Sequence, residues 1–305
     1  SHCRLLLAAV LSLALLQQCL APSVGAGELA VELQENVEYG TGADEKLTMH
    51  IARPKDSTEP APCIVFIHGG GWRAGSKDTF KKAIRDFASE GYVAASVGYR
   101  FAPKHKTPAQ IEDCKCAVRY LRAHADELGI DPTRIGAIGA SAGAHLSMLL
   151  GTMDSGDGCE GEGGWQDQSS KVQAVVSYFG PVDLTESRVG DLPSRQMINE
   201  KAVRSILSNF VGGEPEEHVE ELRQASPITY VGPGDAPMLL FQGTQDILVP
   251  YDHAFTMTDA LTKHGIKGRA ELIMGAGHGW MGDEMARTQR AALEFFDEHL
   301  KGEKK

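Results

Sequence analysis

The sequence has no cluster of lysines and arginines. Its 41 acidic residues outnumber its 30 basic ones, and the formal net charge is −11 at pH 7. A protein that binds a polyanion needs positive charge on its surface. This charge balance argues against nucleic acid or an anionic membrane surface as a partner.

A hydrophobic run long enough for a transmembrane helix is also missing. The most apolar stretch, Leu5–Leu16, follows Arg4 and is about a dozen residues long, whereas a membrane span needs about 20. The small residues Val24-Gly25-Ala26 follow it, as a signal peptidase site requires. We therefore expect residues 1–26 to be a signal peptide of a secreted or periplasmic protein, cleaved near Ala26, with no stable insertion in the membrane.

The alternative is a lipoprotein anchored through Cys19. The residues directly before Cys19 are Leu16-Gln17-Gln18, and they lack the small side chain expected immediately before a lipidated cysteine. Cleavage is therefore favoured over anchoring.

Cysteines are few in the remaining chain. Removal of 26 of the 305 residues leaves 279, with four cysteines: Cys63, Cys114, Cys116 and Cys159. Four thiols in so long a chain do not form a disulfide framework, and their pairing cannot be read from the sequence. The length suffices for one large domain with a deep core, and no repeat or long linker divides it. We expect a single domain over residues 27–305.

Short apolar runs alternate with helical stretches after an alternating pattern at 29–53 that is typical of an antiparallel hairpin. The predicted strands lie in CIVFIHGGGW, YVAASVGY, RIGAIGASAG, VQAVVSYFG, PMLLFQGTQD and AELIMGAGH. The predicted helices cover 77–90, 108–128, a stretch that begins near Ala142, 252–264 and 284–300. This alternation predicts an α/β fold, a mostly parallel sheet with helices on both faces.

Two segments interrupt the alternation. Residues 153–170 are rich in glycine and acidic residues, which predicts a surface insertion. Residues 184–224 have an irregular helical pattern between two strands, which predicts a cap above the carboxyl ends of the strands, where ligands bind in such sheets. We expect the ligand pocket to lie beneath both segments.

The stretch GASAG places Ser141 between a predicted strand and a predicted helix. Glycines at 139 and 143 allow a turn too tight for larger side chains, and such a turn exposes the serine hydroxyl. The backbone N–H of Ala142 then lies at a helix N-terminus, facing any negative charge on a bound oxygen. This pattern indicates a nucleophile.

A second glycine-rich loop, HGGGW, follows an upstream strand. Without side chains at Gly70 and Gly71, their N–H groups can approach a substrate oxygen closely. His68 precedes the glycines at the strand end, which favours a role in fixing the loop over a role as a base.

A serine nucleophile needs a base and an orienting carboxylate. Of eleven histidines, His278 in GAGHGW follows the last predicted strand, on a glycine-rich loop. Two carboxylates compete: Asp246 in GTQDILVP and Asp183 in FGPVDLT. Asp246 is favoured because its strand comes directly before that of the histidine, so that the two loops are neighbours.

The motifs HGGGW, GASAGAHL, GTQDILVP and GAGHGW together resemble the α/β-hydrolase superfamily. More narrowly, they resemble the hormone-sensitive-lipase-like carboxylesterases and the bacterial feruloyl and acetyl-xylan esterases. The resemblance covers most of residues 60–300, with the motifs in family order. It implies an eight-stranded sheet with a small cap, the triad Ser141, Asp246 and His278, and an oxyanion hole formed by Gly70, Gly71 and Ala142.

The resemblance also implies a serine carboxylic-ester hydrolase without a metal or an organic cofactor. Its expected substrates are short-chain or aryl esters, including acetyl or feruloyl esters of plant polysaccharide. Trp72 and Trp280 flank the glycine loop and the histidine, so they either line the substrate pocket or pack in the core. The alternatives are a serine exopeptidase, for whose usual β-propeller 279 residues leave no room, and a non-catalytic binding protein, which has no need of all four motifs.

Overall fold

The computed structural model describes residues 29–55, 57–185 and 193–302. The expected signal peptide, residues 1–26, and Cys19 lie outside the described residues. Within the described part of the chain, no helix is both long and apolar enough to cross a membrane.

Eight strands form one sheet in the order β1-β2-β4-β3-β5-β6-β7-β8. Strand β2 is antiparallel to both β1 and β4, and the neighbours from β4 to β8 are parallel. The bounds are β1 Val31–Gly42, β2 Glu45–Pro54, β3 Ala61–Ile67, β4 Val93–Val97, β5 Ile130–Ala140, β6 Ala174–Tyr178, β7 Met238–Gly243 and β8 Gly268–Ile273. The predicted hairpin and the mostly parallel, eight-stranded sheet are confirmed.

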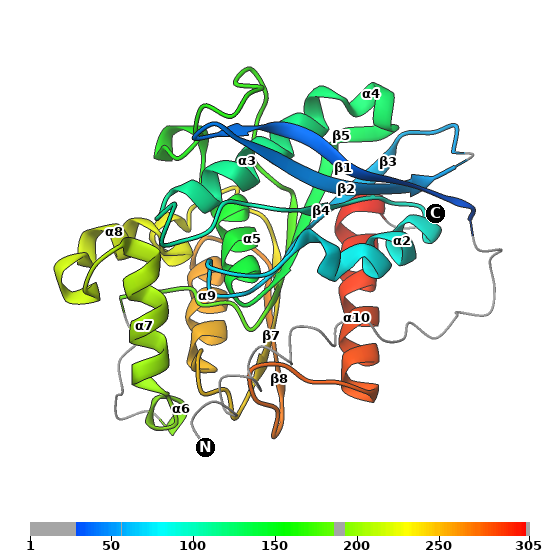
Figure 1. The fold of residues 1–305 in the computed structure, drawn as a ribbon. Coiled ribbons are helices and arrows are strands. Elements are labelled where there is room, and N and C mark those ends of the chain that lie inside the picture. The colour runs from blue at the N-terminus through cyan, green and yellow to red at the C-terminus, as the bar shows by residue number, and fades with distance from the viewer. Residues whose placement is uncertain (1–28, 56, 186–192, 303–305) are drawn as a thin grey trace.

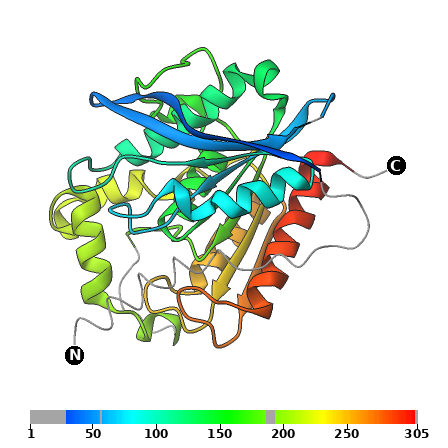
Figure 2. The same ribbon diagram turned by 45° about the vertical axis from the view of Figure 1, so that its right-hand side comes forward.

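Helices cover both faces of this sheet (Figures 1 and 2). One face carries α2 (Lys81–Ser89), which continues the short 3-10 helix η2 (Lys77–Phe80), and α10 (Asp283–Phe296), which ends in the π-helical turn η6 (Asp297–Lys301). The other face carries α3 (Ala109–Ala123), α4 (Ala125–Leu128), α5 (Ala142–Thr152) and α9 (Asp252–Lys263). Each layer buries its own hydrophobic cluster against the sheet, since the strand side chains alternate between the two faces.

The segment predicted as a cap is helical. It contains α6 (Pro193–Gln196), α7 (Glu200–Val211), η4 (Pro215–Glu217) and α8 (Val219–Gln224), and η5 (Pro227–Tyr230) returns it to β7. These helices stand at the left of Figure 1, beside α5 and α9. Arg195 of α6 pairs with Asp252 at 2.8 Å, and the N–H of Asn199 donates to the carbonyl of Ile247. The cap is thereby anchored to the loop that follows β7 and to the start of α9.

The insertion 153–170, which includes η3 (Ser155–Asp157), directly follows α5. It leaves the C-terminal end of α5, about 16 Å along the helix from its first residue. In Figure 1 it is the green loop at the top, whereas β7 and β8 end near the bottom. The length of α5 therefore separates most of this segment from Ser141, while its Met153 and Cys159 line a pocket together with Phe210 of the cap.

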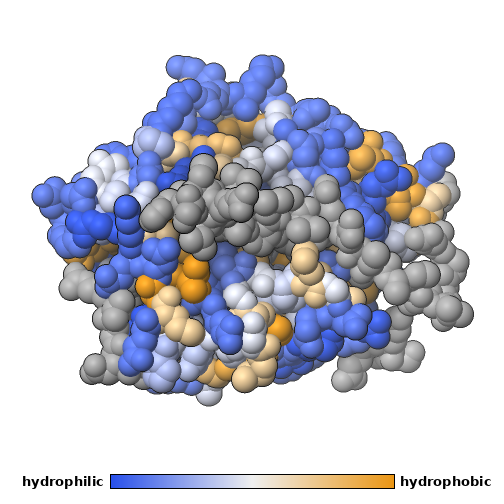
Figure 3. All heavy atoms as spheres, turned by 60° about the horizontal axis from the view of Figure 1, so that its bottom comes forward, coloured by the Kyte–Doolittle hydropathy of each residue, from blue (hydrophilic) through white to orange (hydrophobic). Residues whose placement is uncertain are grey.

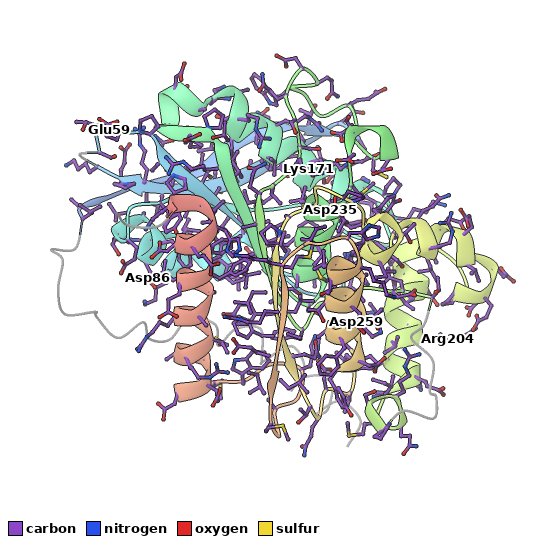
Figure 4. The ribbon with its side chains drawn as sticks, turned by 180° about the vertical axis from the view of Figure 1, so that it is seen from behind. Glu59, Asp86, Lys171, Arg204, Asp235 and Asp259 are labelled. Carbon is purple, nitrogen blue, oxygen red and sulfur yellow. The ribbon has the colours of Figure 1, made fainter. Side chains whose placement is uncertain are left out.

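The insertion is fastened to α3 and to β1. Glu160 pairs with Lys115 at 2.8 Å and with Arg119 at 2.6 Å, and the indole N–H of Trp165 donates to the carbonyl of Tyr39. At its base, Lys171 pairs with Asp154 at 2.6 Å and lies 3.5 Å from Asp235, which is labelled with it in Figure 4. These contacts make the segment part of the scaffold.

The four cysteines that the structure describes are free thiols. Cys63, Cys114 and Cys116 are buried, and Cys159 is partly buried. Burial raises the pKa of the Cys63 thiol to about 12 and that of Cys116 to about 11, so both remain protonated at neutral pH.

Candidate active site

Ser141 lies at a sharp turn between β5 and α5. Its φ of 55° and ψ of −122° form a combination that residues with a side chain rarely adopt. Its N–H donates to the carbonyl of Tyr178 at 2.8 Å, which holds the turn. A Cβ on Gly143 would lie 2.0 Å from the carbonyl oxygen of Ile67, so only glycine lets α5 pack this closely against the end of β3. The turn thereby brings the serine next to the glycine loop that follows β3.

His278 reaches Ser141 from the loop that follows β8. Its Nε2 lies 2.8 Å from Oγ of Ser141, and its Nδ1 lies 2.8 Å from Oδ2 of Asp246. His278 is 32 residues from Asp246 in the sequence and 137 residues from Ser141. The three side chains nevertheless form one chain of hydrogen bonds. This arrangement suits transfer of the serine proton to the imidazole, with the carboxylate orienting the ring.

The carboxylate of Asp246 is buried and accepts hydrogen bonds on both oxygens. Oδ1 accepts from the N–H groups of Leu248 and Val249, at 2.8 and 3.0 Å. Oδ2 accepts from the side-chain amide of Gln242 at 2.9 Å, besides His278. Four donors around a buried carboxylate compensate for its lost hydration and leave it one orientation.

Asp183, the competing carboxylate, does not contact His278. Its Oδ1 accepts from the N–H and the hydroxyl of Thr185, at 2.8 and 2.6 Å, which closes a local turn after β6. The structure thus brings Asp246, and not Asp183, to the histidine.

The glycine loop is held by its own tight geometry. Gly70 has a φ of +120°, and a Cβ there would lie 2.1 Å from the carbonyl oxygen of Ala74. A Cβ on Gly71 would lie 3.2 Å from Cγ2 of Ile206, so the cap helix α7 packs directly on this loop. Ala142, across from the loop, is the first residue of α5, so its N–H has no acceptor within the helix.

His68 anchors the start of the loop. The ring is fully buried and stacked on Tyr99 at 4.4 Å, and its Nδ1 donates to the carbonyl of Gly69 at 2.8 Å. Burial lowers the pKa of His68 to about 4, so the ring is neutral at physiological pH.

The two tryptophans are buried, which favours packing over substrate contact. Trp72 is 3% exposed, stacks on Phe210 at 4.2 Å and donates its indole N–H to Nδ1 of His145 at 3.2 Å. Trp280 is 9% exposed and donates its indole N–H to the hydroxyl of Thr288. Both indoles have their hydrogen bonds inside the protein, so neither needs a ligand.

Two residues beside the triad were missed from the sequence. Gln242 donates to Asp246, and its position as a polar residue inside the apolar strand MLLFQG was a usable signal. Phe179 has a φ of +45° and places its ring 4.7 Å from that of His278. No local sequence pattern indicates that Phe179 lies beside His278, because this contact depends on a loop about 100 residues away.

The carboxyl ends of the parallel strands face the bottom of Figure 1, and Figure 3 views that side. Hydrophobic residues form patches there among hydrophilic ones. Ile247 directly follows Asp246, and Met281 comes three residues after His278, so both lie on this side of the molecule. Both side chains are exposed. Across residues 29–55, 57–185 and 193–302, no group of three or more His, Cys, Asp or Glu side chains is arranged to hold a metal ion.

A family model, BD-FAE, matches residues 49–261. Esterase LipC from Mycobacterium tuberculosis is 32% identical over 251 residues, which cover 81% of this chain and 60% of LipC. The probable carboxylic ester hydrolase LipM of the same organism is 30% identical, over 68% of this chain and 46% of LipM. The chain thus spans about half the length of the curated relatives it matches.

Two solved esterases match over most of their length. A truncated carbohydrate esterase from gut microbiota is 25% identical, with a TM-score of 0.73 over 89% of this chain and 98% of that one. Esterase 2 of Thermogutta terrifontis is similar in two forms. The butyrate-bound form is 28% identical, with a TM-score of 0.68 over 89% of this chain and 94% of that one. The paraoxon-phosphorylated form is 27% identical, with a TM-score of 0.71 over 91% and 97%.

The family match covers well over half of the chain, and both the strand order and the solved relatives agree with it. The chain belongs to the BD-FAE family and has the α/β-hydrolase fold.

Proposed function

We propose that this protein hydrolyses carboxylic esters through an acyl-enzyme formed on Ser141. The observation that carries the proposal is the hydrogen-bonded chain from Oγ of Ser141 through His278 to Asp246, with 2.8 Å at each step. A nucleophile, a base and an orienting carboxylate in this geometry are what acyl transfer requires. The esterase names of the relatives support the same reaction class.

The residues act in sequence. His278 accepts the proton of Ser141 at Nε2 while Oγ attacks the ester carbonyl, and Asp246 stabilises the imidazolium that forms. The N–H groups of Gly70, Gly71 and Ala142 are proposed to donate to the negatively charged oxygen of the tetrahedral intermediate. His278 then gives the proton to the leaving alcohol, and water attacks the acyl-enzyme in a second round. No step uses a metal or an organic cofactor.

We propose short-chain or aryl esters as substrates, including acetyl or feruloyl groups on plant polysaccharide. The cap residue Ile206 lies against Gly71, and the ring of Trp72 fills the space behind the loop, which leaves little room for a long acyl chain. The outer side of α8 carries exposed Glu220, Glu221 and Arg223, unlike a broad apolar surface for an oil interface. The butyrate-bound form of the Thermogutta esterase and the gut carbohydrate esterase support this size and class.

We also propose that the protein is exported from the cytoplasm. Residues 1–26 have the order of a signal peptide, and a secreted or periplasmic enzyme would meet polysaccharide esters outside the cytoplasm. N-terminal sequencing of protein recovered from the periplasm or medium tests this, with a new N-terminus near residue 27 expected.

The test of the function is a series of p-nitrophenyl esters from acetyl to octanoyl, followed by methyl ferulate and acetylated xylan, on the wild type and on Ser141→Ala. We expect the highest kcat/KM for acetyl and butyryl esters and no turnover by the variant. A trend that rises through the long chains would contradict the substrate class, and a variant with half of the wild-type rate would contradict the role of Ser141.

A further inference from the structure

A pocket of about 90 Å³ lies among α3, α5, α7 and α8, outside the catalytic chain of hydrogen bonds. Its walls are mostly apolar, with Ile111, Leu146 and Leu149 among them. Glu221 and Gln224 are exposed and form its rim, so the pocket opens to solvent at α8.

The inner end of the pocket is made of rings. His145 and Phe210 line it, and both are almost fully buried. Behind them, Trp72 stacks on Phe210 at 4.2 Å and donates to His145 at 3.2 Å. Because Trp72 directly follows Gly71, these three rings, which we call the ring wall, stand between the pocket and the glycine loop.

The pocket continues the line of α5 away from the serine. His145, Leu149 and Met153 follow Ser141 at every fourth position, so they lie on one stripe of the helix. His145 and Leu149 are near the serine end and the middle, and Met153 is at the far end. A channel along this stripe would pass from the reacting carbonyl through the ring wall into the pocket.

We propose that the ring wall limits the length of the acyl chain by closing the catalytic site off from this pocket, and that Phe210 is the residue that sets the limit. The proposal rests on the ester-hydrolase function above. In this proposal the pocket can hold the hydrocarbon end of a long acyl chain. The ring wall of the wild type keeps such a chain out.

Phe210 is the replaceable part of the wall. His145 is tied by two hydrogen bonds, from Trp72 and to the carbonyl of Ala225 at 2.6 Å. Trp72 is tied by its indole and by its carbonyl, which accepts from the N–H of Ala102. The side chain of Phe210 has ring contacts alone, so its truncation leaves no buried polar group without a partner.

The size of the pocket sets the expected effect. A dry apolar cavity of about 150 Å³ accepts benzene, so one of about 90 Å³ accepts roughly three or four carbons. Each methylene that becomes buried strengthens transition-state binding about fourfold. Opening the wall therefore favours octanoyl over acetyl esters by at least about tenfold relative to the wild type.

The experiment measures kcat/KM for p-nitrophenyl acetate, butyrate, hexanoate, octanoate and laurate with the wild type, Phe210→Ala and the milder Phe210→Leu. We expect the octanoate-to-acetate ratio to rise at least tenfold in Phe210→Ala and less in Phe210→Leu. The matched control is Phe87→Ala, a buried phenylalanine of α2 on the opposite face of the sheet, which should leave the ratio unchanged.

Refilling the pocket supplies a second test. Ala225 lines it, and Ala225→Leu in the Phe210→Ala background should return the ratio toward the wild-type value. If Phe210→Ala does not fold, Phe210→Leu carries the test. An unchanged ratio in a folded variant that still cleaves acetate overturns the proposal, as does a raised ratio that Ala225→Leu does not lower. A wild type without activity on any ester contradicts the proposed function itself, and the inference falls with it.

Discussion

The side-chain amide of Gln242 joins the strand β7 to the carboxylate of Asp246. Its Nε2 donates to Oδ2 of Asp246 at 2.9 Å and to the carbonyl of Val249 at 3.0 Å. Oδ2 is also the atom that accepts from His278. Gln242 and His278 therefore donate to the same oxygen of the Asp246 carboxylate, and the bond from Gln242 reduces the negative charge on that oxygen.

Gln242→Leu should lower kcat while the protein still folds. The substitution removes the two hydrogen bonds by which the amide holds Asp246 and Val249, so the carboxylate orients the ring of His278 less well. We expect kcat on p-nitrophenyl acetate to fall by about tenfold with KM little changed. An unchanged kcat in the folded variant would show that Gln242 does not position the carboxylate for the reaction.

The two carboxylates that compete in the sequence can be separated by paired variants. Asp246→Asn should lower kcat by about 10⁴, because an amide at this position disfavours the imidazole tautomer that accepts the serine proton. Asp183→Asn should keep most of the activity, since Asp183 accepts its hydrogen bonds from Thr185 among the described residues and has none from His278. Steady-state kinetics on p-nitrophenyl acetate checks both, and an inactive Asp183→Asn beside an active Asp246→Asn would reverse the assignment.

Paraoxon should inactivate the protein by phosphorylating Ser141. The serine oxygen attacks phosphorus, p-nitrophenol leaves, and one diethylphosphoryl group remains on Oγ, since His278 lies within hydrogen-bond distance of this hydroxyl and can take its proton. Intact-protein mass spectrometry should show one adduct on the wild type and none on Ser141→Ala. An adduct that persists in the variant would identify another nucleophile.

Stability should fall as the pH drops from about 6.5 toward 4. Burial lowers the pKa of His68 and of His145 to about 4 each, whereas an unfolded histidine titrates near 6.5. In this window the unfolded chain binds protons that the folded chain does not, so the stabilisation is complete above the unfolded pKa and is lost below it. With both histidines the slope approaches about 2.7 kcal/mol per pH unit near pH 5.

Urea unfolding between pH 7.5 and 4.5 measures this slope. His145→Gln removes one of the two titrating rings and should flatten the curve, while its free energy of unfolding at pH 7.5 falls. A wild-type free energy that is constant across the window would contradict the buried neutral state of these histidines.

Glu160→Gln should destabilise the fold through the insertion. Lys115 and Arg119 are both almost fully buried, and both pair with this carboxylate. Its loss leaves two buried cations without an ionic partner, at a cost of about 3 kcal/mol or more. The matched control is Glu220→Gln, whose partner Arg223 is exposed, and it should leave the midpoint of thermal unfolding unchanged. Equal midpoints for the two variants would show that the pairs at Glu160 contribute nothing.

Much of the fold is encoded locally. The alternation of apolar runs and helical stretches predicts the sheet and both helical layers, because strand and helix periodicity depend on near neighbours in the chain. The same holds for the turn at Ser141, where the glycines at 139 and 143 indicate that two backbone segments pack closely together. The loops that carry Asp246 and His278 follow from strand order, since the carboxyl ends of adjacent parallel strands meet at one edge.

The sequence by itself thus predicted the sheet, the position of the helical cap, and Ser141 and His278 as nucleophile and base, with Asp246 favoured over Asp183 as the carboxylate. Only the tertiary structure decided that Asp183 closes its own turn, that the insertion 153–170 packs on α3, and that Trp72 is buried against His145 and Phe210. The physical reason is the range of the interaction. A turn or a strand depends on neighbouring residues, whereas burial and long-range hydrogen bonds depend on segments that are dozens of residues apart and meet only when the chain has folded.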